Sequence, residues 1–259
     1  MMSSLPPVEV LSLDLFDTLV KVKGFEPRVA FFKSYQKYCQ LLSLSEEEIA
    51  FDNFFSDYRA MIRQYLHQRE KSGEDFTNSG LIIELSKDYN IKISENQAND
   101  VADAYFEELL SKTVPFPNLK ETLEFLAQDY LLILTSNHSW PSHGYETLKQ
   151  IGIGKFFDKI VFSGDIGWAK PFPKIFEEAF KEIDISKEQI MHIGDNPITD
   201  VDGAIEFGLQ ACWCQTREHI KQNQLVYPQK AKDSPLYIGK IHQIKELIPF
   251  LNKVYPHPN

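Results

Sequence analysis

Four short segments of the sequence carry the side chains best suited to chemistry, and each follows a predicted strand. They are Asp14-Leu15-Phe16-Asp17-Thr18-Leu19, Ser136-Asn137, Lys170-Pro171, and Gly194-Asp195 with Asp200. Asp14 directly follows an apolar run, where a carboxylate can face a substrate and act as a nucleophile. Asp195 would bring a second carboxylate to the same crevice. Two carboxylates, a backbone carbonyl and waters are ligands that a hard cation such as Mg²⁺ accepts.

The other two segments offer a cation and neutral hydrogen-bonding groups. Lys170 would neutralise an anionic nucleophile and an anionic substrate together. Pro171 disfavours helix at Lys170 and predicts an extended entry to a helix that begins near Pro173. Ser136 offers a hydroxyl, and Asn137 an amide, for hydrogen bonds to substrate oxygens. Together the four segments predict a site that handles an anionic substrate.

Apolar runs that alternate with helical patterns must position these segments. The predicted strands are Val8–Leu13, Tyr130–Thr135, Lys159–Ser163, Ile190–Ile193 and Leu209–Gln215, with Tyr237-Ile238 as a candidate last strand. The predicted helices are Asn118–Ala127, Gly144–Ile151, Val201–Phe207 and a closing helix over Ile241–Leu251. This alternation predicts an α/β fold with a doubly wound parallel sheet. Ligands bind such sheets outside the carboxyl ends of the strands.

The region between the first two strands, residues 21–113, has a different pattern. Apolar residues recur every three to four positions over Phe31–Leu42, Glu46–Tyr65, Asn78–Asp88 and Glu95–Leu110, as in amphipathic helices. Pro115 and Pro117 mark the return to the sheet. We therefore expect residues 1–20 and 114–259 to form a Rossmann-like core and residues 21–113 to form a helical cap.

Composition excludes several classes of protein and partner. With 43% hydrophobic residues, the 259-residue chain can bury a globular core. Its 27 Lys and Arg against 37 Asp and Glu give a net charge of −10, which argues against nucleic acid or an anionic membrane as the main partner. No apolar segment approaches the length of a membrane span, and residues 1–10 lack a secretory pattern, so we expect a cytoplasmic protein.

Three cysteines do not make a disulfide framework or a zinc site. In a strand, Cys212 and Cys214 would place both sulfur atoms on one face, which suits burial.

Taken together, the four segments resemble the four motifs of the haloacid dehalogenase-like hydrolase superfamily. Their order, spacing and strand context all agree with it, and the predicted helical region lies where that superfamily inserts its cap. The resemblance covers essentially the whole chain. It implies a Mg²⁺-dependent hydrolase that acts on a small phosphorylated metabolite through an aspartyl-phosphate at Asp14.

The resemblance also implies roles for individual residues. Asp14 and Lys170 would be catalytic, and Ser136 and Asn137 would bind the substrate phosphate. Mg²⁺ would be held by the Asp14 side chain, the Phe16 carbonyl oxygen and Asp195. Asp200 would complete the metal site through water or orient Lys170.

Phe16 departs from the superfamily pattern. Most phosphatases of this superfamily carry an acid–base Asp two residues after the nucleophile, and phenylalanine cannot transfer a proton. Asp17, one position later, would replace that group only if the loop turned it inward. Anhydrides and acyl phosphates, whose leaving groups depart easily, would suffer least from the loss.

Two alternatives follow from Phe16. The 2-haloacid dehalogenases carry an aromatic residue at this position and need no leaving-group acid, although they work without a metal and lack the acidic Gly-Asp that Gly194-Asp195 retains. The other alternative is a catalytically weak protein that binds a ligand without useful turnover.

Specificity is expected to lie in the helical cap. Arg28, Tyr58, Arg59 and Arg63 are the cap residues that we select as candidates to contact a second anionic group. His192 alternates with apolar neighbours and is expected in the core or behind the site. Neither the substrate nor the oligomeric state follows from the sequence.

Overall fold

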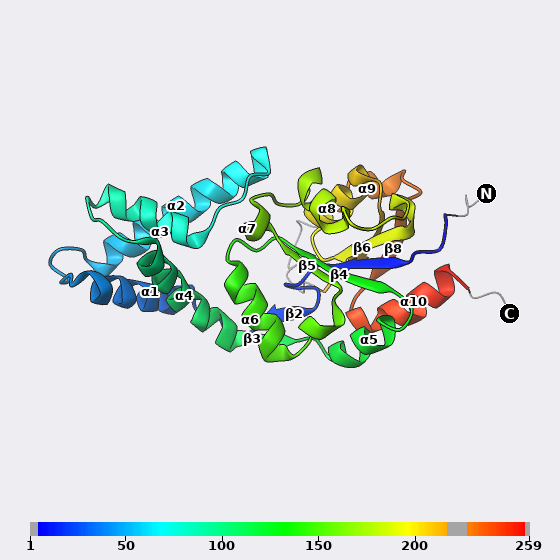
Figure 1. Ribbon diagram of the computed structural model, residues 1–259, viewed down its shortest axis with the longest axis horizontal. Coiled ribbons are helices and arrows are strands. Elements are labelled where there is room, and N and C mark those ends of the chain that lie inside the picture. Colours follow the sequence, from blue (N-terminus) through cyan, green and yellow to red (C-terminus); the bar gives the residue numbers. More distant parts are fainter. Residues whose placement is uncertain (1–4, 217–226, 257–259) are drawn as a thin grey trace.

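A parallel sheet, covered by helices, forms one of two parts of the protein in the computed structural model, which describes residues 5–216 and 227–256 (Figure 1). Its six strands lie in the order β5-β4-β1-β6-β7-β8, and every adjacent pair is parallel. The strands are β1 (Val10–Leu13), β4 (Leu131–Ser136), β5 (Lys159–Phe162), β6 (Ile190–Gly194), β7 (Gln210–Cys214) and β8 (Tyr237–Ile241). The predicted doubly wound sheet is confirmed.

Helices cover both faces of this sheet because alternate strand residues are apolar on each side. One face packs against α5 (Leu119–Leu126), α6 (Pro141–Ile151) and α10 (Leu247–Val254). The other packs against α8 (Pro173–Phe180) and α9 (Gly203–Phe207). Cys212 and Cys214 are both buried on the first face, as predicted. Short elements complete the core: α7 (Ser163–Ile166) and single 3-10 turns at Gly154–Phe156, Lys187–Gln189, Lys230–Lys232 and Ile244–Glu246.

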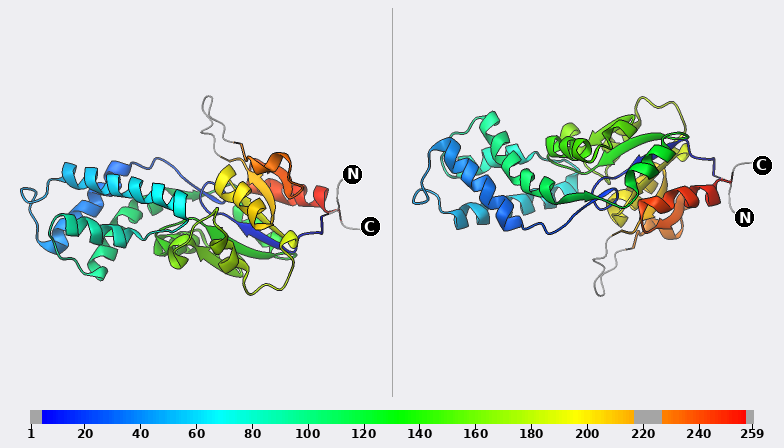
Figure 2. Two further views of the ribbon diagram at one scale, coloured as in Figure 1. Left: turned by 90° about the horizontal axis from the view of Figure 1, so that it is seen from above. Right: turned by 90° about the horizontal axis from the view of Figure 1, so that it is seen from below.

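Four helices form a separate group, which we call the helical segment. They are α1 (Pro27–Leu42), α2 (Phe51–Ser72), α3 (Asn78–Asp88) and α4 (Glu95–Lys112). A hydrophobic core of their own, centred on Tyr38, Phe54 and Leu81, holds them together. The antiparallel pair β2 (Val20–Val22) and β3 (Thr113–Pro115) joins this segment to the sheet. Figure 2 shows that the helical segment extends away from one end of the sheet.

A second connection, which we call the docking bridge, joins residues 73–75 after α2 to residues 167–169 after α7. The Ala169 amide donates to the Gly73 carbonyl at 2.9 Å, and the Asp75 amide donates to the Gly167 carbonyl at 2.9 Å. Between them, Glu74 and Trp168 form an antiparallel bridge. The helical segment is therefore hydrogen-bonded to the loop that leads directly into Lys170.

The prediction of a helix over Glu46–Tyr65 is wrong at both ends. The backbone amide and hydroxyl of Ser45 donate to the Glu48 carboxylate at 2.8 and 3.0 Å, which closes a turn before the helix begins at Phe51. At the other end α2 continues to Ser72 and stops where Gly73 adopts a left-handed conformation with φ 79°. The two extra turns carry α2 over the carboxyl edge of the sheet.

The closing helix also begins later than predicted. Ile241 is the last residue of β8 and pairs with Cys214, and α10 begins only at Leu247. None of the helices in residues 5–216 and 227–256 has both the length and the apolar character of a membrane span.

Candidate active site

A cavity of about 480 Å³ opens at the carboxyl ends of β1, β4 and β6. β4 and β6 lie on opposite sides of β1, so this edge is the topological switch point of the sheet, where ligands usually bind in such folds. All four predicted segments reach it, together with two residues of α2. The lining residues are Asp14, Phe16, Arg69, Glu70, Ser136, Asn137, Lys170, Pro171, Asp195, Asn196, Ile198, Thr199 and Asp200.

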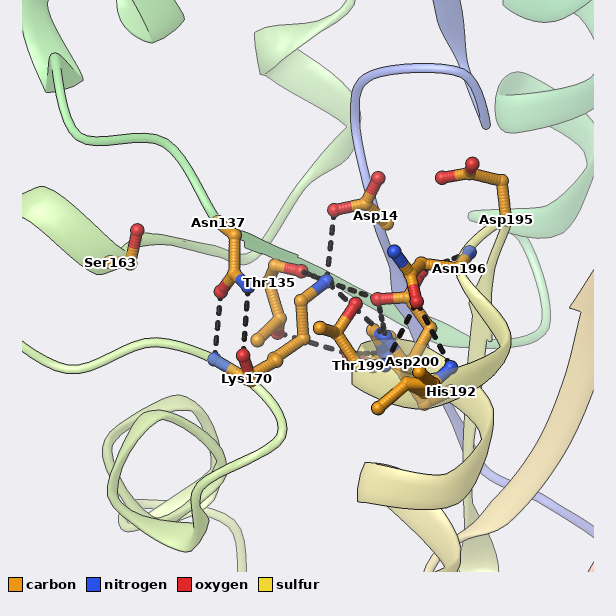
Figure 3. Close-up of polar contacts among 12 residues, drawn as sticks. Asp14, Thr135, Asn137, Ser163, Lys170, His192, Asp195, Asn196, Thr199 and Asp200 are labelled. Atoms are coloured by element: carbon orange, nitrogen blue, oxygen red, sulfur yellow. Dashed lines mark hydrogen bonds and ion pairs between the residues drawn. The ribbon is translucent and has the colours of Figure 1, made fainter. Parts of the chain in front are cut away.

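A buried ammonium between two carboxylates lies at the floor of this cavity (Figure 3). Lys170 Nζ lies 2.9 Å from Asp14 Oδ1 and 2.7 Å from Asp200 Oδ1. It also donates to the Thr135 carbonyl at 2.7 Å. Because Lys170 is only 3% exposed, the two carboxylates compensate for the lost hydration of its charge.

The pKa shifts of the three groups differ. Burial raises the pKa of the Asp14 carboxyl, with Lys170 acting against it. Burial acts to raise the pKa of Asp200 as well, yet Lys170 and His192 together bring it below its ordinary value. Burial disfavours the charged form of Lys170, but Asp14 and Asp200 outweigh it and raise the pKa of the ammonium. Lys170 and Asp200 are thus both charged and form an ion pair, whereas the ionised form of Asp14 is less strongly favoured.

Three carboxylates converge in a way that suits a hard cation. Asp14, Asp195 and Asp200 each offer an oxygen atom, and these atoms lie within 4.8 Å of one another. All three residues are buried, and an all-oxygen set of this kind matches the preference of Mg²⁺. The oxygens of Asp200 already have donors, because Oδ1 contacts Lys170 and Oδ2 accepts the Asn196 amide at 2.8 Å. Of the two roles expected for Asp200, the geometry favours the orientation of Lys170.

Gly194 is the last residue of β6 and leads into the loop that holds Asp195 and Asp200. A residue with a side chain would not fit at this position. A Cβ atom on Gly194 would lie 2.3 Å from Asp200 Cγ. The Trp213 indole donates to the Asp195 carbonyl at 2.8 Å, which fixes the loop from β7. The predicted helix over Val201–Phe207 begins earlier than expected, as a wide π-type turn over Pro197–Asp202, so Asp200 lies inside the helical turn.

Asn137 contacts the backbone of Lys170. Its side-chain oxygen accepts the Lys170 amide at 2.7 Å, and its side-chain nitrogen donates to the Lys170 carbonyl at 2.9 Å. Asn137 thus fixes the loop from which the ammonium projects. Ser136 is 1% exposed at the end of β4, and its side chain is among the groups that favour the ionised form of Asp14 by lowering the pKa of that carboxyl. Contact of either residue with a substrate stays a prediction.

His192 lies behind the ion pair, as its strand position predicts. Its Nδ1 is 2.8 Å from the Ser12 hydroxyl, and that hydroxyl donates to Thr135 Oγ1 at 3.0 Å. Its Nε2 lies 3.4 Å from Asp200 Oδ1 and 3.5 Å from Lys170 Nζ. Burial, assisted by the nearby ammonium of Lys170, lowers the pKa of His192 to about 4, so the ring is neutral at pH 7.

Phe16 lines the cavity and packs against two histidine rings. Its ring centroid lies 5.1 Å from that of His138 and 5.8 Å from that of His143. Asp17 has a left-handed backbone with φ 60°, and its amide donates to the Val20 carbonyl at 2.7 Å. Asp17 is absent from the cavity lining within the described residues, so the geometry does not place its carboxyl where the missing acid would stand.

The helical segment reaches the cavity through residues that the sequence did not indicate. Tyr58 is buried inside that segment, and Arg28 pairs with Asp52 on its surface. Arg59 and Arg63 are exposed, and none of these four candidates lines the described cavity. Arg69 and Glu70 line it instead. A correct length for α2 would have indicated them, because they lie in the two turns beyond Tyr65.

A family model described as haloacid dehalogenase-like hydrolase matches residues 26–214. This chain belongs to that family. Among curated relatives, the glyceraldehyde 3-phosphate phosphatase of Methanothermobacter thermautotrophicus is 30% identical over 141 residues, which cover 52% of this chain and 58% of that protein. The chain thus spans little more than half the length of this relative.

Solved structures of the haloacid dehalogenase-like family share the whole fold with this member. A 2-haloacid dehalogenase from Pseudomonas syringae pv. Tomato DC3000 has a TM-score of 0.63 at 19% identity, covering 95% of this chain and 99% of that one. The HAD-hydrolase YfnB from Bacillus subtilis, solved with bound magnesium, has a TM-score of 0.58 at 20% identity, covering 95% of this chain and 100% of that one. At these identities the likeness concerns the fold.

Proposed function

We propose that this family member hydrolyses a small phosphorylated metabolite through an aspartyl-phosphate intermediate, an acyl phosphate formed on Asp14. One observation carries the proposal: a buried carboxylate lies 2.9 Å from a buried ammonium, and two further carboxylates converge on the same cavity. The phosphatase named among the curated relatives supports it.

The reaction has two steps. An Asp14 carboxylate oxygen attacks phosphorus and forms a bond to it while the bond from phosphorus to the leaving-group oxygen breaks. Water then attacks the phosphorus of the aspartyl-phosphate, which releases phosphate and restores the Asp14 carboxylate. Lys170 stabilises the negative charge on Asp14 and on the bound phosphoryl group, and Asp200 keeps that ammonium in place.

The carboxylates fit a Mg²⁺ ion. We propose that Asp14, Asp195 and the Phe16 carbonyl oxygen hold it, with Asp200 supporting Lys170. When bound, the ion would reduce the repulsion between an anionic nucleophile and an anionic phosphate. The magnesium described for YfnB agrees with this proposal.

Phe16 restricts the substrates that this site turns over well. The phenylalanine side chain cannot protonate the leaving group, so the reaction favours leaving groups that depart as stable anions, such as those of acyl phosphates and anhydrides.

We further propose that the protein lies in the cytoplasm, where Cys39, Cys212 and Cys214 stay reduced.

The purified chain is tested on p-nitrophenyl phosphate, with Mg²⁺ or with a chelator, beside Asp14→Asn. We expect metal-dependent release of p-nitrophenol and a loss of about 10³-fold or more in Asp14→Asn. Turnover that survives either change contradicts the proposal. Halide release from a 2-haloacid without metal selects the dehalogenase alternative. If neither p-nitrophenyl phosphate nor a 2-haloacid gives product, while a phosphate analogue raises the melting temperature of the protein, the alternative of a weak ligand-binding protein is supported.

A further inference from the structure

Part of the cavity lining comes from the last turns of α2. Within the described residues, Arg69 and Glu70 are the residues of the helical segment that line the cavity. The ammonium of Lys170 is already paired with two carboxylates. Arg69 is the other cation in the described lining, and it comes from the helical segment, whereas Lys170 follows the sheet strand β5.

Contacts hold Arg69 at the cavity. Its side chain is 21% exposed, and its Nη1 donates to Asp75 Oδ1 at 3.3 Å. Asp75 has a fully buried side chain, and the same oxygen accepts the Phe76 amide at 2.9 Å. The Phe76 ring lies 5.9 Å from the guanidinium carbon. A solvated surface arginine would lack such an anchor.

The guanidinium keeps capacity for a ligand. It carries five N–H donors, and Asp75 accepts from one of its nitrogen atoms in the described structure. Asp75 is itself fixed by the docking bridge, because its amide donates to the Gly167 carbonyl. The remaining donors can form paired hydrogen bonds with a carboxylate or a phosphate, the geometry for which arginine is best suited.

We propose that Arg69 binds a second anionic group of the substrate, so that the preferred substrates are phosphorylated acids or bisphosphates and not phosphate esters with a neutral tail. This inference rests on the proposed function, because it assumes that the phosphoryl group occupies the site of Asp14 and Lys170. Glu70, the next residue of α2, would oppose binding of such an anion.

The test compares substrates and ligands that differ only at the far end. Kinetics are measured with 3-phosphopropionate, 1,3-propanediol bisphosphate and propyl phosphate on the wild type and on Arg69→Gln, Glu70→Gln and Arg63→Gln. Because Phe16 leaves the turnover of such alkyl phosphates slow, KM approaches the dissociation constant and reports binding. Arg63 is an exposed arginine of the same helix outside the cavity lining and serves as the control. We expect Arg69→Gln to raise KM about 10- to 100-fold for substrates with a second anion and less than about 2-fold for propyl phosphate.

Glu70→Gln should act in the opposite direction and lower KM for the same anionic substrates. Arg69→Lys should recover part of the binding because it restores the charge without the paired donors. The carboxylate and the bisphosphate substrates distinguish the two kinds of second anion. Equal losses on all three substrates, or an effect as large in Arg63→Gln, would overturn the assignment.

A binding measurement separates this inference from the proposed reaction. Calorimetric titration with 3-phosphonopropionate and with propylphosphonate requires no turnover. If hydrolysis fails but Arg69→Gln weakens only the phosphonopropionate, the anion site stands and the reaction is wrong. If hydrolysis proceeds but the two phosphonates bind equally well to the wild type, the reaction stands and the assignment of Arg69 is wrong.

Discussion

The protonation state of Asp14 depends on Lys170, whose ammonium contacts the carboxylates of both Asp14 and Asp200. Asp200 accepts from the ammonium and from the Asn196 amide, so it is the better satisfied partner. Burial raises the pKa of Asp14 and Lys170 acts against it, so the ammonium favours the ionised form that the proposed nucleophile needs. Neutral His192 completes the environment of the ammonium and adds no charge.

Phe16→Asp should restore general acid–base chemistry at this edge. The aromatic side chain lines the cavity beside Asp14, so a carboxyl there could protonate a leaving group. We expect rates for alkyl phosphates to rise about 10- to 100-fold, with little change for aryl and acyl phosphates. The measurement is kcat/KM against the pKa of the leaving group, whose slope should become shallower. Phe16→Asn, which cannot transfer a proton, is the matched control, and an unchanged slope in Phe16→Asp contradicts this role.

The sequence predicted the residues that line the cavity better for the sheet than for the helical segment. Asp14, Ser136 and Asp195 stand at or directly after strand ends, and parallel strands bring such ends to one edge whatever the intervening chain does. Arg69 reaches the cavity only because α2 continues beyond Tyr65. The apolar positions of α2 that pack in the helical segment end at Tyr65, whereas the helix itself ends only at the left-handed Gly73.

The docking bridge joins the proposed anion site at Arg69 to the loop that carries Lys170. Residues 73–75 carry Asp75, which holds Arg69, and residues 167–169 lead into Lys170. Asn137 fixes the same loop from the other side through the backbone of Lys170. A shift of the helical segment would therefore be transmitted to both cations of the cavity.

Gly73→Ala should disturb this bridge. A Cβ atom there would lie 2.3 Å from the Phe172 ring, and φ is 79°. We expect faster hydrogen exchange at the Ala169 amide and a loss of about 10-fold in kcat/KM, because the Lys170 loop moves. Gly24→Ala is the control, since it has φ 65° and nothing within 4 Å. Both variants should lose about 1–2 kcal/mol from backbone strain, so equal activity in the two would refute the coupling.

The ends of helices and strands could be predicted where local side chains determine them. They could not be predicted where pairing with a distant strand determines them. The strands of the sheet follow apolar runs, and Pro173 opens α8 as expected. By contrast, Ile241 belongs to β8 because it pairs with Cys214, a partner far away in the sequence. The helical pattern after it gave no sign of this pairing.

At the scale of the whole molecule, the described residues form two bodies, the sheet with its helices and the helical segment, which meet near the candidate active site. The sheet and the helical segment each have their own core, and α4 contacts α6 where Phe106, Trp140 and two histidines pack together. His138 Nε2 lies 2.8 Å from His143 Nδ1. This cluster adjoins Phe16, so its charge state affects the junction and the cavity wall together.

Stability should fall in mildly acidic solution because buried histidines must take up protons. Burial lowers the pKa of His143 and of His192 to about 4, and burial with the neighbouring His143 lowers that of His138. The unfolded chain binds these protons near pH 6.5, so it holds more protons than the folded state between about pH 4 and 6.5. The free energy of unfolding therefore decreases as pH falls through that window, by about 2 kcal/mol for each such histidine between pH 7 and 5.

Urea unfolding of the wild type and of His143→Asn at pH 7 and pH 5 checks this expectation. Asp14, whose pKa burial raises, works in the opposite direction in both proteins, so the comparison isolates the contribution of the histidine. We expect His143→Asn to be less stable than the wild type at pH 7, yet to lose about 1–2 kcal/mol less between pH 7 and 5. His67→Asn, an exposed position on α2, should match the wild type. If His143→Asn keeps the full pH dependence, the junction between the two bodies does not respond to acid.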